Sequence, residues 1–306
     1  MTQHTVQTDT AARAMLLKMV VHQWQPRRHD KRVSAEVAER YKADEAMGSY
    51  LKRLVTKEQL RKINTLTDKI RDVWLERTLP WLDQGTRILP NAFYFKTLEG
   101  LKALIHQRDD AVLELAHNWE AVIEEARVRL NGLFDANDYP SAQVLRDAYR
   151  IDIVPMPFPS SDDFRLGVLG PDSEEDEAAL RAEHNAAVKA AVGDALRDVW
   201  QRIYDATEKV ADRLNAYKVS PDDEKKGGQR TDNPFRDSLI DNLRELIDIL
   251  PDLNIADDPM LAGMGDKIRQ QLCQYDGQML RDDGTLRKQT ALAAESILAQ
   301  VSDFLG

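Results

Sequence analysis

Several features that mark common enzyme and membrane classes are missing from this chain of 306 residues. Its single cysteine, Cys273, excludes an internal disulfide and any zinc site built on cysteine pairs. No apolar run approaches the ~20 residues of a membrane-spanning helix, and the polar start Met1–Thr10 is unlike a signal peptide. We therefore expect a cytoplasmic protein that does not contact a membrane.

The short motifs of nucleotide binding and nucleophilic catalysis are also missing. No glycine-rich phosphate loop, dinucleotide-binding pattern or G-x-S-x-G turn occurs. Glu114 and His117 have the i, i+3 spacing of half a di-iron site, but Arg181 stands three residues before His184, so a second pair is missing. We predict no metal and no cofactor, and an enzyme with an unrecognised site ranks last among three possible functions.

Charge is plentiful, at 31% of residues, but it is unevenly placed. Residues 1–77 hold 16 Lys and Arg against 10 Asp and Glu, whereas residues 78–306 hold 26 against 42. The acidic bulk argues against a molecule that coats nucleic acid, although a local basic face remains compatible with it. Attraction between the two oppositely charged parts, or between neighbouring subunits, is the alternative.

Two long runs, residues 97–134 and 173–217, carry apolar side chains at mixed steps of three and four and contain no proline. Ser173 followed by acidic residues is typical of a helix start. The spacing is that of helices that wrap around one another. We predict a mainly α protein with a long antiparallel, coiled-coil-like hairpin packed on a helical bundle; separate packing of the two runs is the alternative.

Between the runs, the segment 135–172 predicts a small β finger at the tip of the hairpin. Tyr149–Val154 alternates as a strand does, a proline-rich stretch follows, and Phe164–Leu169 offers a second strand. The predicted parts are thus an N-terminal helical part (1–96), the hairpin (97–219), a polar linker (220–233) and a C-terminal helical part (234–306).

The N-terminal part carries the clearest local signals. Met15–Trp24 is apolar and fits either a strand or a buried helix. Ser34 is predicted to cap a short helix that ends at Lys42. Thr56 and Gln59 form a capping box that opens the next helix, and Pro80 closes it.

The densest basic segment follows directly after a tryptophan, and single-stranded nucleic acid is bound by cations on phosphates and rings on bases. The candidate residues for such binding are Trp24, Arg27, Arg28, Lys31 and Arg32. The alternative is a solvated loop whose arginines pair with the acidic part of the chain.

A second set of candidates consists of apolar residues that we expect to contact a protein partner. Three adjacent aromatic residues cannot all face one core, and the finger exposes further apolar side chains. The set comprises Phe93, Tyr94, Phe95, Ile153, Met156 and Phe158. For the aromatic triplet, closing the end of a bundle is the alternative role.

The order of features resembles an uncharacterised phage and bacterial family, domain of unknown function 3150. The resemblance covers about half of the chain and is carried by the segment ending at Trp24 with its basic continuation, and by LRKINTLTDKI, LPNAFYF, the Tyr139–Ser141 turn and YRIDIVPMP. It implies a phage or mobile-element protein in a bacterial host cytoplasm, accompanied by MoxR-type AAA ATPases and von Willebrand A-type proteins. It implies no reaction and no catalytic residues.

Together these features favour a non-enzymatic adaptor or scaffold that acts through protein–protein contacts, with or without self-association, and that has a MoxR-type AAA ATPase as a possible partner. An accessory protein of phage replication or recombination that binds single-stranded nucleic acid is the second hypothesis. The enzyme is the third.

Overall fold

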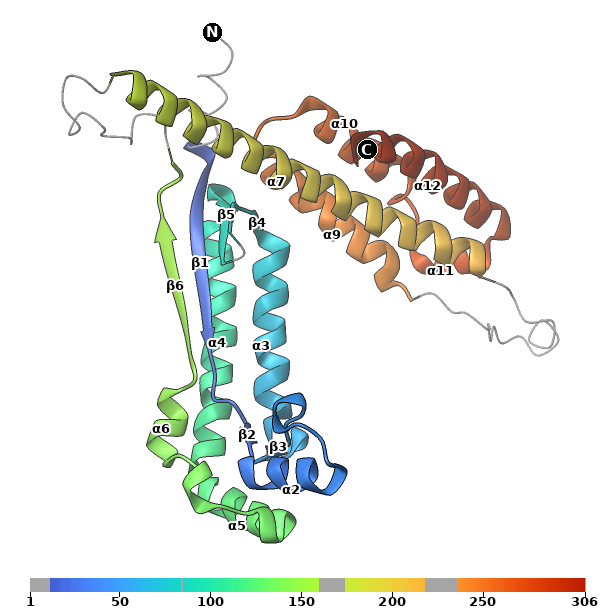
Figure 1. Ribbon diagram of the computed structural model, residues 1–306. Coiled ribbons are helices and arrows are strands. Elements are labelled where there is room, and N and C mark those ends of the chain that lie inside the picture. Colours follow the sequence, from blue (N-terminus) through green and yellow to red (C-terminus); the bar gives the residue numbers. More distant parts are fainter. Residues whose placement is uncertain (1–11, 84, 160–173, 218–235, 306) are drawn as a thin grey trace, which may run out of the picture. The chain divides into compact units, whose positions relative to one another are not determined.

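The computed structural model describes residues 12–83, 85–159, 174–217 and 236–305, and it is mainly α-helical with two small sheets (Figure 1). The chain divides into two compact units, each assembled from separate segments. Unit 1 comprises Met1–Leu17, Arg77–Tyr94 and Pro155–Gly306, and unit 2 comprises Lys18–Glu76 and Phe95–Val154. This division is interleaved along the chain and differs from the predicted succession of parts.

Unit 2 is a group of helices closed at one end by a short β-ribbon (Figure 1). The ribbon pairs β2 (Arg27–His29) with β3 (Leu51–Arg53), and the short helix η1 (Glu45–Met47) precedes β3. The helices are α2 (Lys31–Tyr41), α3 (Lys57–Arg77), α4 (Tyr94–His117), α5 (Trp119–Leu130) and α6 (Ala142–Asp147); only the last residue of α3 and the first of α4 belong to unit 1.

Unit 1 is organised around the longest helix, α7 (Glu174–Ala216), which packs against α12 (Gly284–Leu305) and α9 (Ser238–Leu253) (Figure 1). Trp200 of α7 stacks on Phe304 of α12 with ring centroids 4.3 Å apart. Unit 1 also contains α10 (Pro259–Gln271), α11 (Gly277–Asp282), β4 (Leu79–Pro80) and β5 (Thr86–Pro90). Among the described residues, no helix combines the length and apolar character needed to cross a membrane.

The four-stranded sheet has the order β4-β5-β1-β6. The open choice for Met15–Trp24 is settled as strand β1 (Ala14–His22), and the predicted strand Tyr149–Val154 is confirmed as β6 (Arg150–Met156). The second predicted finger strand, Phe164–Leu169, lies outside the described residues, as do the Ser173 cap and the linker 220–233.

The prediction for the two long runs needs a correction. The second run is one helix, α7, but the first is divided at Asn118 into α4 and α5. The apolar stripe of α4 and α5 is buried against α3 within unit 2, while the stripe of α7 is covered within unit 1. Since each stripe is covered inside its own unit, neither needs the predicted hairpin seam for its burial.

The predicted start is correct for α3 and wrong for α2. At α3, the backbone N–H of Thr56 donates to Gln59 Oε1 (2.8 Å) and the N–H of Gln59 donates to Thr56 Oγ1 (3.2 Å), which confirms the capping box. At α2, Asp30 rather than Ser34 is the cap, because its carboxylate accepts from Val33 N (3.1 Å). Ser34 lies inside the helix and donates to Asp30 O (2.7 Å).

Candidate interaction surface

Trp24 lies in the core of unit 2 rather than on its surface. It is 9% exposed and meets Trp119 edge to face, with ring centroids 5.4 Å apart at 89°. Trp119 in turn donates from Nε1 to the carbonyl oxygen of Pro140 (2.7 Å). The ring of Trp24 therefore fixes the start of the ribbon and has no open face on which a base could stack.

The register of the ribbon decides which basic side chains share a face. Arg27 pairs with Arg53, Arg28 with Lys52, and His29 with Leu51. Because paired residues point to the same side and successive residues alternate, Arg27, Arg53, His29 and Leu51 form one face. Arg28 and Lys52 belong to the other face.

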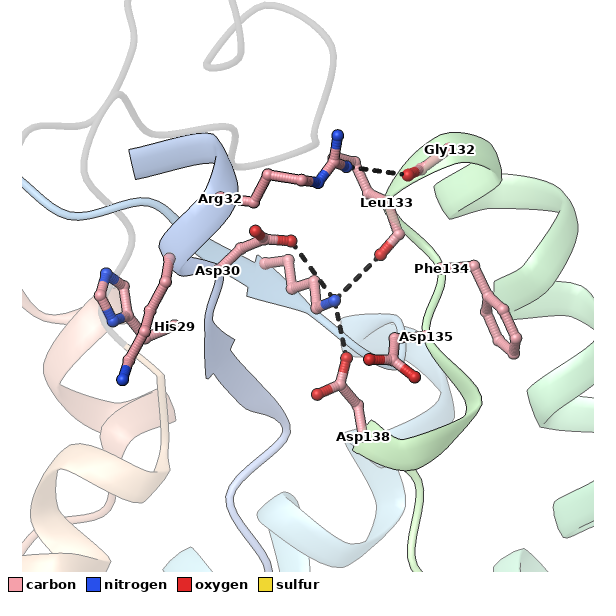
Figure 2. A pocket seen from close by; sticks show the side chains of 10 residues that line it. His29, Asp30, Arg32, Gly132, Leu133, Phe134, Asp135 and Asp138 are labelled. Atoms are coloured by element: carbon pink, nitrogen blue, oxygen red, sulfur yellow. Dashed lines mark hydrogen bonds and ion pairs between the residues drawn. The ribbon is translucent and has the colours of Figure 1, made fainter. Parts of the chain in front are cut away.

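Lys52 fastens its face of the ribbon to the connection between α5 and α6. Its Nζ donates to the carbonyl oxygen of Leu133 (3.0 Å) and forms ion pairs with Asp138 Oδ2 (2.7 Å) and Asp30 Oδ2 (3.4 Å) (Figure 2). The side chain is only 6% exposed. We refer to Lys52, Asp30, Asp138 and Leu133 as the Lys52 cluster; it joins the start of α2, β3 and the α5–α6 connection.

The charges of the Lys52 cluster support one another. Burial lowers the pKa of Lys52, but the hydrogen bond and charge of Asp138, and then those of Asp30, outweigh it, so the pKa lies above its ordinary value of 10.5. The pKa of Asp30 is lowered from 3.8, first by the backbone N–H of Val33 and against a contribution from burial, with Lys52 adding to the lowering. Both groups are therefore charged at neutral pH.

An open hollow of about 480 Å³ surrounds the Lys52 cluster (Figure 2). Arg32 crosses its rim, donating from Nη2 to Gly132 O (3.1 Å) and pairing with Glu36 (3.2 Å). Two of its carboxylates already hold Lys52, and the described residues contain no group of three or more His, Cys, Asp or Glu side chains that could hold a metal ion. The residues that line the hollow therefore attach the ribbon to the α5–α6 connection.

Four cations of the same region have no side-chain hydrogen bond or ion pair to any described residue: Arg27, Arg28, Lys31 and Arg53. The side chains of Arg27, Arg28 and Lys31 are exposed and that of Arg53 is half-buried. Of the five residues predicted to bind nucleic acid, three thus remain available, whereas Trp24 is in the core and Arg32 is tied to Gly132 and Glu36.

The same end of unit 2 exposes large apolar side chains. Together α2, η1 and the ribbon form what we call the cap (Figure 1). Only Ala38 of α2 is buried, while Val37 and Tyr41, one turn apart, are 47% and 73% exposed. In the following segment the exposed fractions are 83% for Met47, 38% for Tyr50 and 55% for Leu51.

The predicted partner contacts are divided between core and surface. Phe93 is buried beneath the guanidinium of Arg77, which lies 5.4 Å from the ring centre, and Phe158 is buried against Trp81. Tyr94, Ile153 and Met156 are half-buried, and Phe95 is 83% exposed. The sequence analysis did not single out the cap residues; the four-residue spacing of Val37 and Tyr41 fits a buried helix face as well as an exposed one.

Comparisons with models of protein families, with curated proteins and with solved structures give no match to this chain.

Proposed function

We propose that the protein is a non-enzymatic adaptor that binds another protein through the cap of unit 2. The observation that carries this proposal is the gathering of five exposed apolar side chains, Val37, Tyr41, Met47, Tyr50 and Leu51, within one short stretch. Large apolar side chains exposed together mark contact surfaces, whereas single ones are ordinary. Covering one such side chain contributes about 1.5–3 kcal/mol at most, and several together help to offset the entropy that two proteins lose on association.

The way in which the cap is held supports the same proposal. The Lys52 cluster and the hydrogen bond from Val33 N to Asp30, at the start of α2, hold the backbone of the cap in place. Its five large apolar side chains remain exposed. A surface whose backbone is already ordered loses less conformational entropy on binding, which favours affinity. The resemblance described above makes a MoxR-type AAA ATPase or a von Willebrand A-type protein in a bacterial host cytoplasm the partner to test first.

Photo-crosslinking tests the proposal directly. A photoreactive amino acid is placed at Met47 in the cap and, as a matched control, at Leu292 of α12, which is 65% exposed. Adducts formed in cells are identified by mass spectrometry. We expect one defined protein adduct from position 47 and none of that identity from position 292. Equal adducts from both positions, or nucleic acid alone at position 47, would contradict the proposal.

A second candidate function is an accessory protein that binds single-stranded nucleic acid. The side chains of Arg27, Arg28 and Lys31 favour it, because they have no partner among the described residues and phosphates would neutralise them. With Trp24 in the core, Tyr41 and Tyr50 are the exposed rings of the cap that could stack on bases. A salt-sensitive affinity for a thymidine oligonucleotide that falls on Arg27→Glu would support this function, and no binding at low salt would remove it.

A further inference from the structure

The open face of the β-ribbon places two arginines directly opposite each other. Arg27 and Arg53 are cross-strand partners, so their Cβ atoms are about 5 Å apart, and like charges at this distance destabilise a ribbon. Neither guanidinium has a carboxylate partner among the described residues. An anion supplied from outside the described part of the chain would turn this repulsion into attraction.

The carboxylates nearest in the sequence are already engaged. Asp30 accepts from Val33 N and holds Lys52, while Glu36 pairs with Arg32. The ribbon thus has two cations on one face that no described carboxylate neutralises. Since the Lys52 cluster holds the other face, Arg27 and Arg53 point away from the attachment.

Apolar side chains accompany the two arginines. Leu51, 55% exposed, lies on the same face as Arg27 and Arg53, and Met47, 83% exposed, precedes it in the chain. A polynucleotide offers phosphates and flat bases, which gain little from leucine and methionine. An amphipathic segment rich in Asp and Glu offers carboxylates for the arginines and apolar side chains for Leu51 and Met47.

We propose that the open face of the ribbon, Arg27, Arg53 and Leu51, with neighbouring Met47, binds an acidic amphipathic helix of a partner protein. This inference rests on the adaptor function and adds the chemistry of the partner. Guanidinium groups bind carboxylates through two parallel hydrogen bonds, and the apolar contacts select a helix with one apolar side over an unstructured acidic tail.

The probe is a labelled peptide of about 18 residues, with leucines on one helical face and glutamates elsewhere, long enough to form a helix when bound. Fluorescence anisotropy measures its binding to the full chain, beside a peptide of the same composition in shuffled order and a thymidine oligonucleotide. We expect the patterned peptide to bind, and to bind more weakly as NaCl rises from about 50 to about 300 mM, because salt screens exposed charges.

Two variants and a matched control locate the site. Arg27→Glu/Arg53→Glu is expected to weaken peptide binding at least about tenfold, because the new carboxylates repel the glutamates of the peptide. Leu51→Ser is expected to weaken it about threefold, because an apolar contact is lost. The control Lys69→Glu/Lys102→Glu makes the same change in net charge at two exposed lysines of α3 and α4 and is expected to stay within about twofold. Circular dichroism and thermal melting confirm that each variant is folded.

Each other outcome overturns the proposal. Equal binding of the shuffled peptide, an unaffected ribbon variant, or no binding of the patterned peptide excludes this partner chemistry. Oligonucleotide binding that the ribbon variant abolishes assigns the face to nucleic acid. Sedimentation that reveals self-association lost in that variant assigns it to a second copy, whose unit 1 carries 32 Asp and Glu against 21 Lys and Arg. A protein adduct at Met47 without peptide binding leaves the adaptor function standing and removes only this inference.

Discussion

Lys52 and Arg53 are neighbours in the sequence but lie on opposite faces of the same β-ribbon. The ammonium of Lys52 is buried and has three oxygen partners within 3.4 Å, whereas the guanidinium of Arg53 has none among the described residues and faces Arg27. One face thus attaches the ribbon to unit 2, and the other presents charge. Basic residues in one short segment can therefore have opposite roles, and the position of carboxylates decides between them.

The comparison is tested most severely by Lys52→Met. The variant leaves Asp30 and Asp138 close together without their cation and removes the hydrogen bond to Leu133, and we expect unit 2 to lose about 3 kcal/mol of unfolding free energy. Arg53→Met, the matched change on the other face, is expected to stay within about 0.5 kcal/mol. Urea denaturation combined with hydrogen exchange of β3 measures both. Equal losses in the two variants would contradict the proposed division of roles.

Acid should destabilise the attachment of the ribbon less than Lys52→Met does, because the hydrogen bond from Lys52 to Leu133 remains. A carboxylate whose pKa is lowered in the folded state stabilises the protein above its unfolded pKa, 3.8 for Asp30, and loses that effect as the pH falls through the folded value. The difference in melting temperature between the native chain and Asp30→Asn should therefore be constant above about pH 5 and shrink below about pH 4. If the difference in melting temperature grew as the pH fell, Asp30 would not stabilise the folded protein through its charged form.

Alkaline conditions act on the other member of the pair. The pKa of Lys52 is raised above 10.5, so its contribution is present below that value and is lost only as the pH rises through the folded pKa. The Lys52 cluster should accordingly remain intact between the two limits, which covers the neutral range.

Local patterns in the sequence predicted several elements correctly. The Thr56–Gln59 capping box and the strand Tyr149–Val154 need only a few neighbouring residues, and both are present. Predictions of which elements pack together, which depend on residues far apart in the sequence, were less accurate. The apolar stripes of residues 97–134 and 173–217 indicated burial but not what covers them, because any apolar surface satisfies a stripe.

The same limit applies to the candidate surface. The basic segment after Trp24 was recognisable from composition, yet the core position of Trp24 depends on Trp119, almost a hundred residues away. The division of the cations depends on Asp138 and Gly132, which hold Lys52 and Arg32 across a similar separation. Only the pairing register sets Arg27 opposite Arg53, and a one-residue slip would reverse both faces.

Tyr139→Phe tests a smaller part of the attachment. The hydroxyl of Tyr139 donates to the carbonyl oxygen of Leu54, just after β3, at 2.9 Å in a buried position. Burial, with the charge of Asp138 adding to it, raises the pKa of Tyr139 to about 12, so the hydroxyl stays a donor at neutral pH. We expect a loss of about 1 kcal/mol in urea denaturation. Tyr41→Phe, at a side chain 73% exposed, is the control and should cost nothing measurable.

The smallest expected effect has the opposite sign. Arg53→Gln removes one of two like charges that lie directly opposite, so the free protein should gain a few tenths of a kcal/mol in stability. In an Arg27→Gln background the same change should bring no gain, because no repulsion is left to relieve. A double-mutant cycle by thermal melting at low ionic strength gives the coupling. A coupling energy of zero at low ionic strength would mean that the two guanidiniums do not repel each other, and the need for an external carboxylate would disappear. An open binding face instead requires a repulsive coupling that decreases as salt is added.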